Sequence, residues 1–139
     1  MERRLIPLSI KIIGTLLIID ASLKIATIQL GIDMVLGFPL KGPPAVFFKV
    51  VYAGLLSFVG FGLWQLREVA RQIGVYLQVY RIVDQFALLV FTFANWNPSA
   101  SKYPPALSAL VLASISLIPA LVQGVILWLL LRKRSFFLK

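Results

Sequence analysis

Cysteine and histidine are both absent from the 139-residue chain. Without cysteine there is no disulfide bond, no catalytic thiol and no thiolate-bound metal. Without histidine, imidazole acid–base chemistry, histidine-ligated haem and the common zinc sites are excluded as well. The residue types that most often build metal centres and nucleophilic active sites are therefore missing from this protein.

Charged residues are scarce, at 14% of the chain against about 25% in ordinary soluble domains. Hydrophobic residues make up 60%, and the mean hydropathy is +0.92. Five acidic and fourteen basic residues are too few to cover a soluble fold of this size, so the composition predicts a protein dissolved in a lipid bilayer. The net charge of +9 is then a signal of membrane topology, and no nucleic acid partner is expected.

Four apolar stretches are long enough to cross a bilayer as helices. They are separated by a loop rich in glycine and proline at 31–44, by a short polar turn with Arg67, Glu68 and Arg71, and by a second loop at 97–105. The predicted fold is all-α, a bundle of four transmembrane helices. It forms a single integral membrane domain over 1–139, with spans of about 5–30, 45–66, 72–96 and 106–131.

The basic residues predict the orientation, because short loops rich in Lys and Arg stay in the cytoplasm. With four spans, eight basic residues fall on one side: Arg3, Arg4, Arg67, Arg71, Arg132, Lys133, Arg134 and Lys139. The other side has Lys41 and Lys102, with Lys49 near its boundary. Both termini are therefore expected in the cytoplasm, with the protein in an inner (plasma) membrane. A three-span topology would separate the basic ends and fits the same rule less well.

The fourth stretch carries small residues at steps of three and four along one helical face. They are Ala106, Ala109, Ala113, Ser116, Ala120 and Gly124. Lipid tails are as apolar as leucine, so helices associate in a bilayer through close approach at such small side chains. The stripe is interpreted either as a docking face for another subunit or as a surface that packs against the other spans of the chain, which is the simpler interpretation.

Four of the charged residues inside the predicted spans need an explanation, because such a charge costs about 2.5–3.5 kcal/mol on insertion scales and normally has a partner. Asp20 and Lys24 are one turn apart in the first span, and Arg81 and Asp84 are three residues apart in the third. We expect each pair to form on its own helix, because antiparallel spans should place Asp20 in the outer half and Arg81 in the inner half. The functional hypothesis is a proton or ion path, and the alternative is a structural polar lock between helices.

Catalytic constellations are not found among the other side chains. The carboxylates are scattered, no serine has a base near it in sequence, and neither a phosphate-binding glycine loop nor a cluster of metal ligands is present. The sequence therefore predicts that the protein is not an enzyme and needs no cofactor. Ten Phe, four Tyr and three Trp leave contacts with lipids or a pigment open.

Two segments resemble a known group of proteins. The turn after the second span reads Gly62-Leu63-Trp64-Gln65-Leu66-Arg67-Glu68-Val69-Ala70-Arg71, and the last helix ends Leu129-Leu130-Leu131-Arg132-Lys133. Both are similar to a loose group of uncharacterised small four-helix bacterial integral membrane proteins, in which a G-L-x-x-L-R-x-x-A-R turn joins the second and third spans. The resemblance covers about residues 54–134 and departs at Val69, where an aromatic residue is frequent. It implies a fold and a membrane, and no activity.

The expected function is non-catalytic. With almost no mass outside the predicted spans, the partners should be membrane lipids and other membrane protein subunits, and the chain would be an accessory or stabilising subunit of a larger complex, docked through its small-residue stripe. The alternative is a small homo-oligomeric transporter or channel for an ion or small molecule, built around Asp20, Lys24, Arg81 and Asp84.

Overall fold

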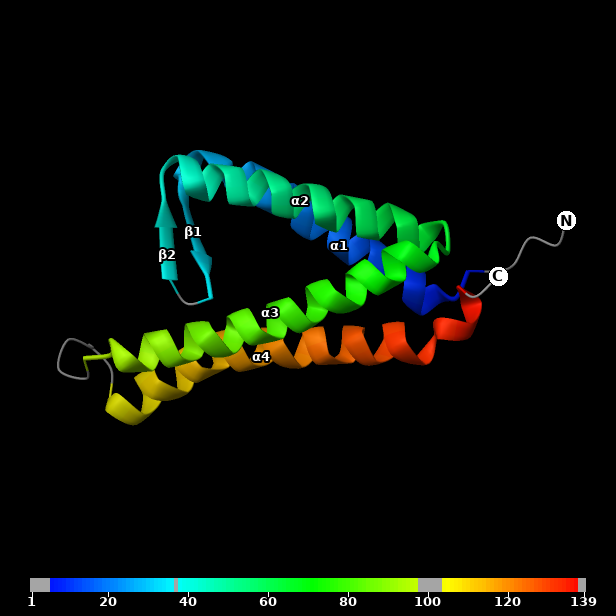
Figure 1. Cartoon of the computed structure of the whole chain (residues 1–139). Helices are drawn as coiled ribbons and strands as arrows, with labels where there is room; N and C mark the ends of the chain where they lie inside the picture. The colour runs from blue at the N-terminus through cyan, green and yellow to red at the C-terminus, as the bar shows by residue number, and fades with distance from the viewer. Residues whose placement is uncertain (1–5, 37, 98–103, 138–139) are drawn as a thin grey trace, which may run out of the picture.

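The computed structural model describes residues 6–36, 38–97 and 104–137, and most of them are helical (Figure 1). The α-helices are α1 (Leu8–Ala26), α2 (Pro43–Trp64), α3 (Glu68–Ala94) and α4 (Pro105–Arg132). The shorter elements are the 3₁₀ helices η1 (Ile28–Leu30) and η3 (Arg134–Phe136) and the strands β1 (Ile32–Val35) and β2 (Phe38–Lys41). The predicted all-α class is confirmed for the described residues, apart from one small hairpin.

Three of the helices are long and apolar enough to cross a membrane, and they span Pro43–Trp64, Glu68–Ala94 and Leu107–Arg132. Helix α1 is shorter, at 19 residues, and carries the three charged residues Lys11, Asp20 and Lys24. Its length corresponds to about 28 Å, close to the roughly 30 Å hydrocarbon thickness of a bilayer. The sequence predicted four spans, so α1 is the element whose charges need a structural explanation.

Helix α3 begins a full turn earlier than the sequence predicted. Glu68, expected in a polar turn, is the first helical residue, where its negative charge is favourable against the helix dipole. The guanidinium of Arg71 pairs with this carboxylate, with Nε donating to Oε2 at 2.7 Å. The connection to α2 is therefore only three residues long. Gly62 permits this tight turn, because a Cβ there would collide with Ala70.

Residues 31–44 contain a β-hairpin where the sequence predicted an irregular loop. Strands β1 and β2 pair antiparallel with Val35 opposite Phe38, so only two residues connect them. Leu36 takes the left-handed conformation that such short turns require, with φ of 49°. Pro39 is tolerated in β2 because each strand of a two-stranded hairpin has a free edge, where the missing N–H of proline needs no partner.

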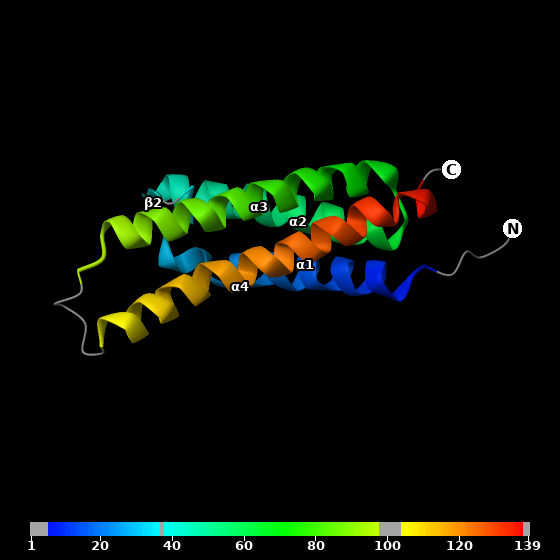
Figure 2. The same ribbon diagram turned by 90° about the horizontal axis from the view of Figure 1, so that it is seen from below.

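The helices pack as two antiparallel pairs. Helix α1 lies along α2, α3 lies along α4, and the pairs meet mainly between α2 and α3. The pairs are close together at the α2–α3 turn and diverge toward the β-hairpin (Figure 1). The start of α1 and the end of α4 lie at the same end as that turn in both views (Figures 1 and 2). Arg3, Arg4, Lys102 and Lys139, used above for the orientation, lie outside the described residues.

Helices α1 and α2 cross closely at two glycines. A Cβ on Gly60 would lie 2.7 Å from Cγ1 of Ile18 and 2.8 Å from the carbonyl oxygen of Gly14. A Cβ on Gly14 would in turn lie 2.8 Å from the carbonyl oxygen of Gly60. Beside this crossing, Nε1 of Trp64 donates to the carbonyl oxygen of Lys11 at 3.2 Å. The contact between these helices therefore depends on the absence of side chains at one point.

Replacing Gly60 with alanine should weaken this crossing. The added methyl group must displace Ile18 or the backbone of α1, and such overpacking typically costs about 1–3 kcal/mol. We expect Gly60→Ala to lower the unfolding temperature of the detergent-solubilised protein by several degrees. Gly54 is the matched control, because it is exposed on the same helix and a Cβ there meets no atom within 4 Å. Equal unfolding temperatures for the two variants would contradict the close crossing.

Candidate functional site

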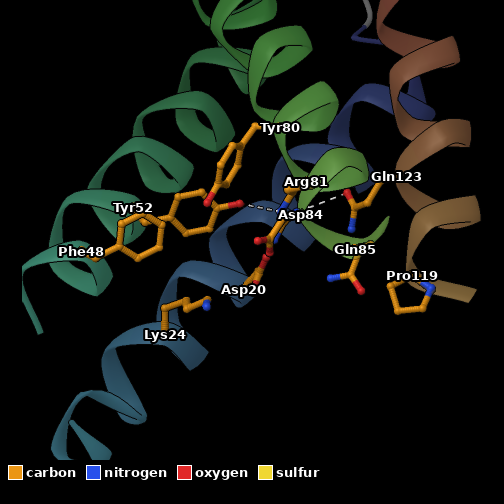
Figure 3. Close-up of a pocket in the computed structure, with 10 residues that line it drawn as sticks. All are labelled: Asp20, Lys24, Phe48, Tyr52, Tyr80, Arg81, Asp84, Gln85, Pro119 and Gln123. Atoms are coloured by element: carbon orange, nitrogen blue, oxygen red, sulfur yellow. Dashed lines mark hydrogen bonds and ion pairs between the residues drawn. The ribbon is translucent and has the colours of Figure 1, made fainter. Parts of the chain in front are cut away.

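A polar cavity of about 310 Å³ lies between the four helices (Figure 3). It is lined by Asp20, Lys24, Phe48, Tyr52, Tyr80, Arg81, Asp84, Gln85, Pro119 and Gln123. Each helix contributes at least one polar or aromatic side chain. The four charged residues that the sequence analysis singled out therefore all line one cavity, together with polar and aromatic neighbours that sequence spacing did not connect to them.

Arg81 lies at the centre of this cavity and contacts one side chain on each of the three other helices. Its guanidinium forms an ion pair with Asp20 of α1 through Nη2. Nε donates to the hydroxyl of Tyr52 on α2 at 2.8 Å, and Nη1 donates to Oε1 of Gln123 on α4 at 3.3 Å (Figure 3). The planar guanidinium carries five N–H donors in a fixed fork, which suits a single side chain to three partners in different directions. Each of its three nitrogens has a partner.

The two local charge pairs predicted from the sequence do not form, and that prediction was wrong. Arg81 pairs with Asp20 across the bundle, and Lys24 pairs with Asp33 of the β-hairpin. The error lay in the estimated depths. Asp20 is the thirteenth residue of α1 and Arg81 the fourteenth of α3, and both helices start at the same end of the bundle. The two side chains are therefore at the same level and can meet.

The β-hairpin is attached to two of the residues that line the cavity. Lys24 Nζ lies 3.1 Å from both carboxylate oxygens of Asp33 on β1. The backbone N–H of Leu36, at the hairpin turn, donates to Oδ1 of Asp84 at 2.5 Å. The hairpin thus connects α1 with α3 at the end where the helix pairs diverge. Asp33 was not recognised as a site residue from the sequence, where the available signal was that this acid follows Lys24 by nine residues.

The opposite end of the cavity is closed by tight packing. Gln78, one turn from Arg81 toward the α2–α3 turn, is fully buried, and neither atom of its side-chain amide has a hydrogen-bond partner among the described residues. One turn further, a Cβ on Gly74 would lie 3.1 Å from Val59 of α2 and 3.4 Å from Leu130 of α4. Three helices therefore touch around apolar side chains at this level. Buried amides such as that of Gln78 usually bind water.

The small-residue stripe of α4 has two different surroundings. Ser116 is buried, and α4 packs mainly against α3. Ala120 and Gly124 instead line a shallow apolar groove between α3 and α4, next to the exposed ring of Trp128. The remaining members are Ala109 and Ala113, which are half-buried, and Ala106, whose side chain lies outside the described part of the structure. Part of the stripe thus faces its own chain and part is open.

Comparisons with known proteins add no assignment. The chain matches no protein-family model, no curated protein and no solved structure. Within residues 6–36, 38–97 and 104–137, no group of three side chains is suited to hold a metal ion. The chemistry of the cavity is therefore the basis for a functional assignment.

The ion pair between Arg81 and Asp20 predicts a strong coupling between the two positions. Arg81→Met leaves the Asp20 carboxylate without its cation. Breaking a fully buried pair typically costs about 3–5 kcal/mol, and a smaller loss is expected here because the Asp20 side chain is 30% exposed. The double variant Asp20→Leu/Arg81→Met removes both charges and should regain at least half of this loss. Thermal unfolding in detergent measures the effect, with Lys11→Met as the control for an exposed charge on α1. Additive effects of the two substitutions would show that the pair is not formed.

Proposed function

We propose that the protein crosses the membrane four times and transports a small polar solute through the cavity between its helices. The observation that supports this most strongly is the convergence of two acids, two bases and two glutamines from three helices on one cavity. Ionisable side chains within a bilayer are expensive, and those that line a cavity typically mark the path of a substrate or an ion. The proposed role is binding and passage without covalent chemistry.

Helix α1 serves as the fourth crossing in this proposal, because two of its three charges have partners inside the protein. Asp20 pairs with Arg81, and Lys24 pairs with Asp33. Lys11 is exposed near the start of the helix, from where its long side chain can reach the lipid headgroups. Both termini would then lie on the side of the basic α2–α3 turn, and the rule for basic loops makes that side the cytoplasm of an inner-membrane protein.

The proposed path runs between the four helices of the chain, through the cavity that ten of their side chains line. The hairpin contacts at one end and the packing around Gly74 at the other are the two places where passage would require movement.

Transport requires the cavity to be reached from both sides of the membrane, and the cysteine-free chain makes this measurable. Gln85→Cys places a single thiol at the cavity wall. We expect a membrane-impermeant methanethiosulfonate reagent to label it both in right-side-out and in inverted vesicles. Val79→Cys, on an exposed apolar part of the same helix, is the control and should stay unlabelled from either side. Labelling of Gln85→Cys from one side only would rule out transport through this cavity.

An accessory subunit of a larger membrane complex remains the second candidate. The open groove between α3 and α4 supports it, because Ala120 and Gly124 at its base would let another helix approach closely. A Cβ atom added at Gly124 would have no neighbouring atom within 4 Å.

Four substitutions test whether the chain is an accessory subunit. If the chain is an accessory subunit, Ala113→Leu and Ala120→Leu should release it from a larger assembly solubilised in mild detergent, while Asp20→Asn and Asp84→Asn should leave that assembly intact. Migration in native gels compares the variants directly. A wild-type chain that migrates alone after gentle solubilisation would exclude this candidate.

A further inference from the structure

We infer that the cavity binds a monovalent organic cation of the ammonium type, held by the carboxylate of Asp84 beside the rings of Phe48, Tyr52 and Tyr80. This inference deepens the proposed function and rests on it, since it names the class of solute that the cavity would take. Asp84 and these three rings all line the cavity (Figure 3).

The charges around the cavity leave one carboxylate without a counter-ion. Arg81 is paired with Asp20, and Lys24 is paired with Asp33. Asp84 has no ion pair with any described residue, and one of its oxygens accepts the backbone N–H of Leu36. The four charges of the cavity wall balance, but Arg81 is taken up by Asp20 and Lys24 by Asp33, so Asp84 is the carboxylate of this wall without an ion pair among the described residues. The second oxygen of Asp84 remains for a ligand that supplies one positive charge.

Tyr80 contributes a further aromatic side chain to the cavity wall. It lies four residues before Asp84 on α3, so both side chains project from the same side of the helix. Its hydroxyl is fully buried, so the ring is the part of Tyr80 that a ligand in the cavity would contact. Figure 3 shows the hydroxyl-bearing ring on the wall of the cavity.

Aromatic rings continue this wall and favour cations over anions. The rings of Phe48 and Tyr52 are stacked with centroids 5.6 Å apart, and those of Tyr52 and Tyr80 are 6.1 Å apart. The Tyr52 ring already has Lys24 Nζ at 5.7 Å and Arg81 Cζ at 5.8 Å from its centroid. The faces of aromatic rings attract cations, and rings with a carboxylate are the usual setting for ammonium groups.

Other classes of ligand fit this cavity less well. An anion would meet the Asp84 carboxylate, while both basic groups of the cavity are already engaged by acids. A divalent metal ion prefers several oxygen ligands, and the described residues contain no group of three acidic side chains that could hold one. A volume of about 310 Å³ is sufficient for a small organic cation.

Choline and its uncharged isostere 3,3-dimethyl-1-butanol test this inference on the full-length protein in detergent. They have the same shape and hydroxyl group, and they differ only in the charge of the quaternary centre. We expect isothermal titration calorimetry to give choline an affinity at least about tenfold higher than that of the isostere, since a desolvated cation–π contact and an ion pair together exceed about 1.4 kcal/mol. Equal affinities, or no binding of choline, would overturn the inference.

One variant assigns the binding to Asp84. Asp84→Asn keeps an oxygen for the Leu36 N–H and should fold normally, but it should lower choline affinity about tenfold or more without affecting the isostere. Glu68→Gln is the control, because it removes an acid from the same helix outside the cavity. An unchanged choline affinity in Asp84→Asn would show that Asp84 does not hold the cation.

The binding experiment and the labelling of Gln85→Cys separate the two proposals. Selective binding of choline together with labelling from one side only would leave the cation site in place and refute transport. Labelling from both sides without cation selectivity would support transport and refute the cation site.

Discussion

The arrangement of the bundle depends on one guanidinium placed near the middle of four apolar helices. Arg81 on α3 binds Asp20 on α1, Tyr52 on α2 and Gln123 on α4. In the bilayer that we propose for this protein, no hydrophobic force would act between helices, so directional polar contacts and close approach would hold the helices together. Without partners this charge would be costly to bury, and with them it fixes the depth of every helix relative to the others. The cavity exists because these partners converge.

The β-hairpin lies on one side of Arg81 along the bundle, and the close contacts at glycine lie on the other. At the divergent end, Asp33 and the Leu36 N–H bind Lys24 and Asp84, so polar groups of the cavity also hold the hairpin. At the other end, helices approach closely at Gly14, Gly60 and Gly74, where apolar contacts replace polar ones. One end is thus held by a few polar contacts and the other by close packing, a difference relevant to how a solute could enter and leave.

The helices followed from the sequence, because they depend on local composition. The sequence also singled out the four charged residues that line the cavity, and their functional role stays a prediction. The hairpin at 31–44 was missed, since Pro39 and several glycines suggested a loop and short strand pairing leaves little periodicity. The small-residue stripe on α4 was recognised from the sequence. Only the structure shows that its residues have different surroundings, since Ser116 is buried and Gly124 lines an open groove. Gly14 was not noticed, because a close approach depends on the partner helix.

By itself the sequence determined that the chain is apolar and helical, that it has too few charges for a soluble surface, and that Asp20, Lys24, Arg81 and Asp84 need partners. Only the tertiary structure decided which partners they have. Residues three or four apart on one helix are neighbours in any fold, so spacing alone favoured local pairs. Pairing across helices depends on the relative depth of the two residues, and a difference of a few residues in where each helix begins is enough to change it. That depth is set by packing between helices, which no single segment encodes.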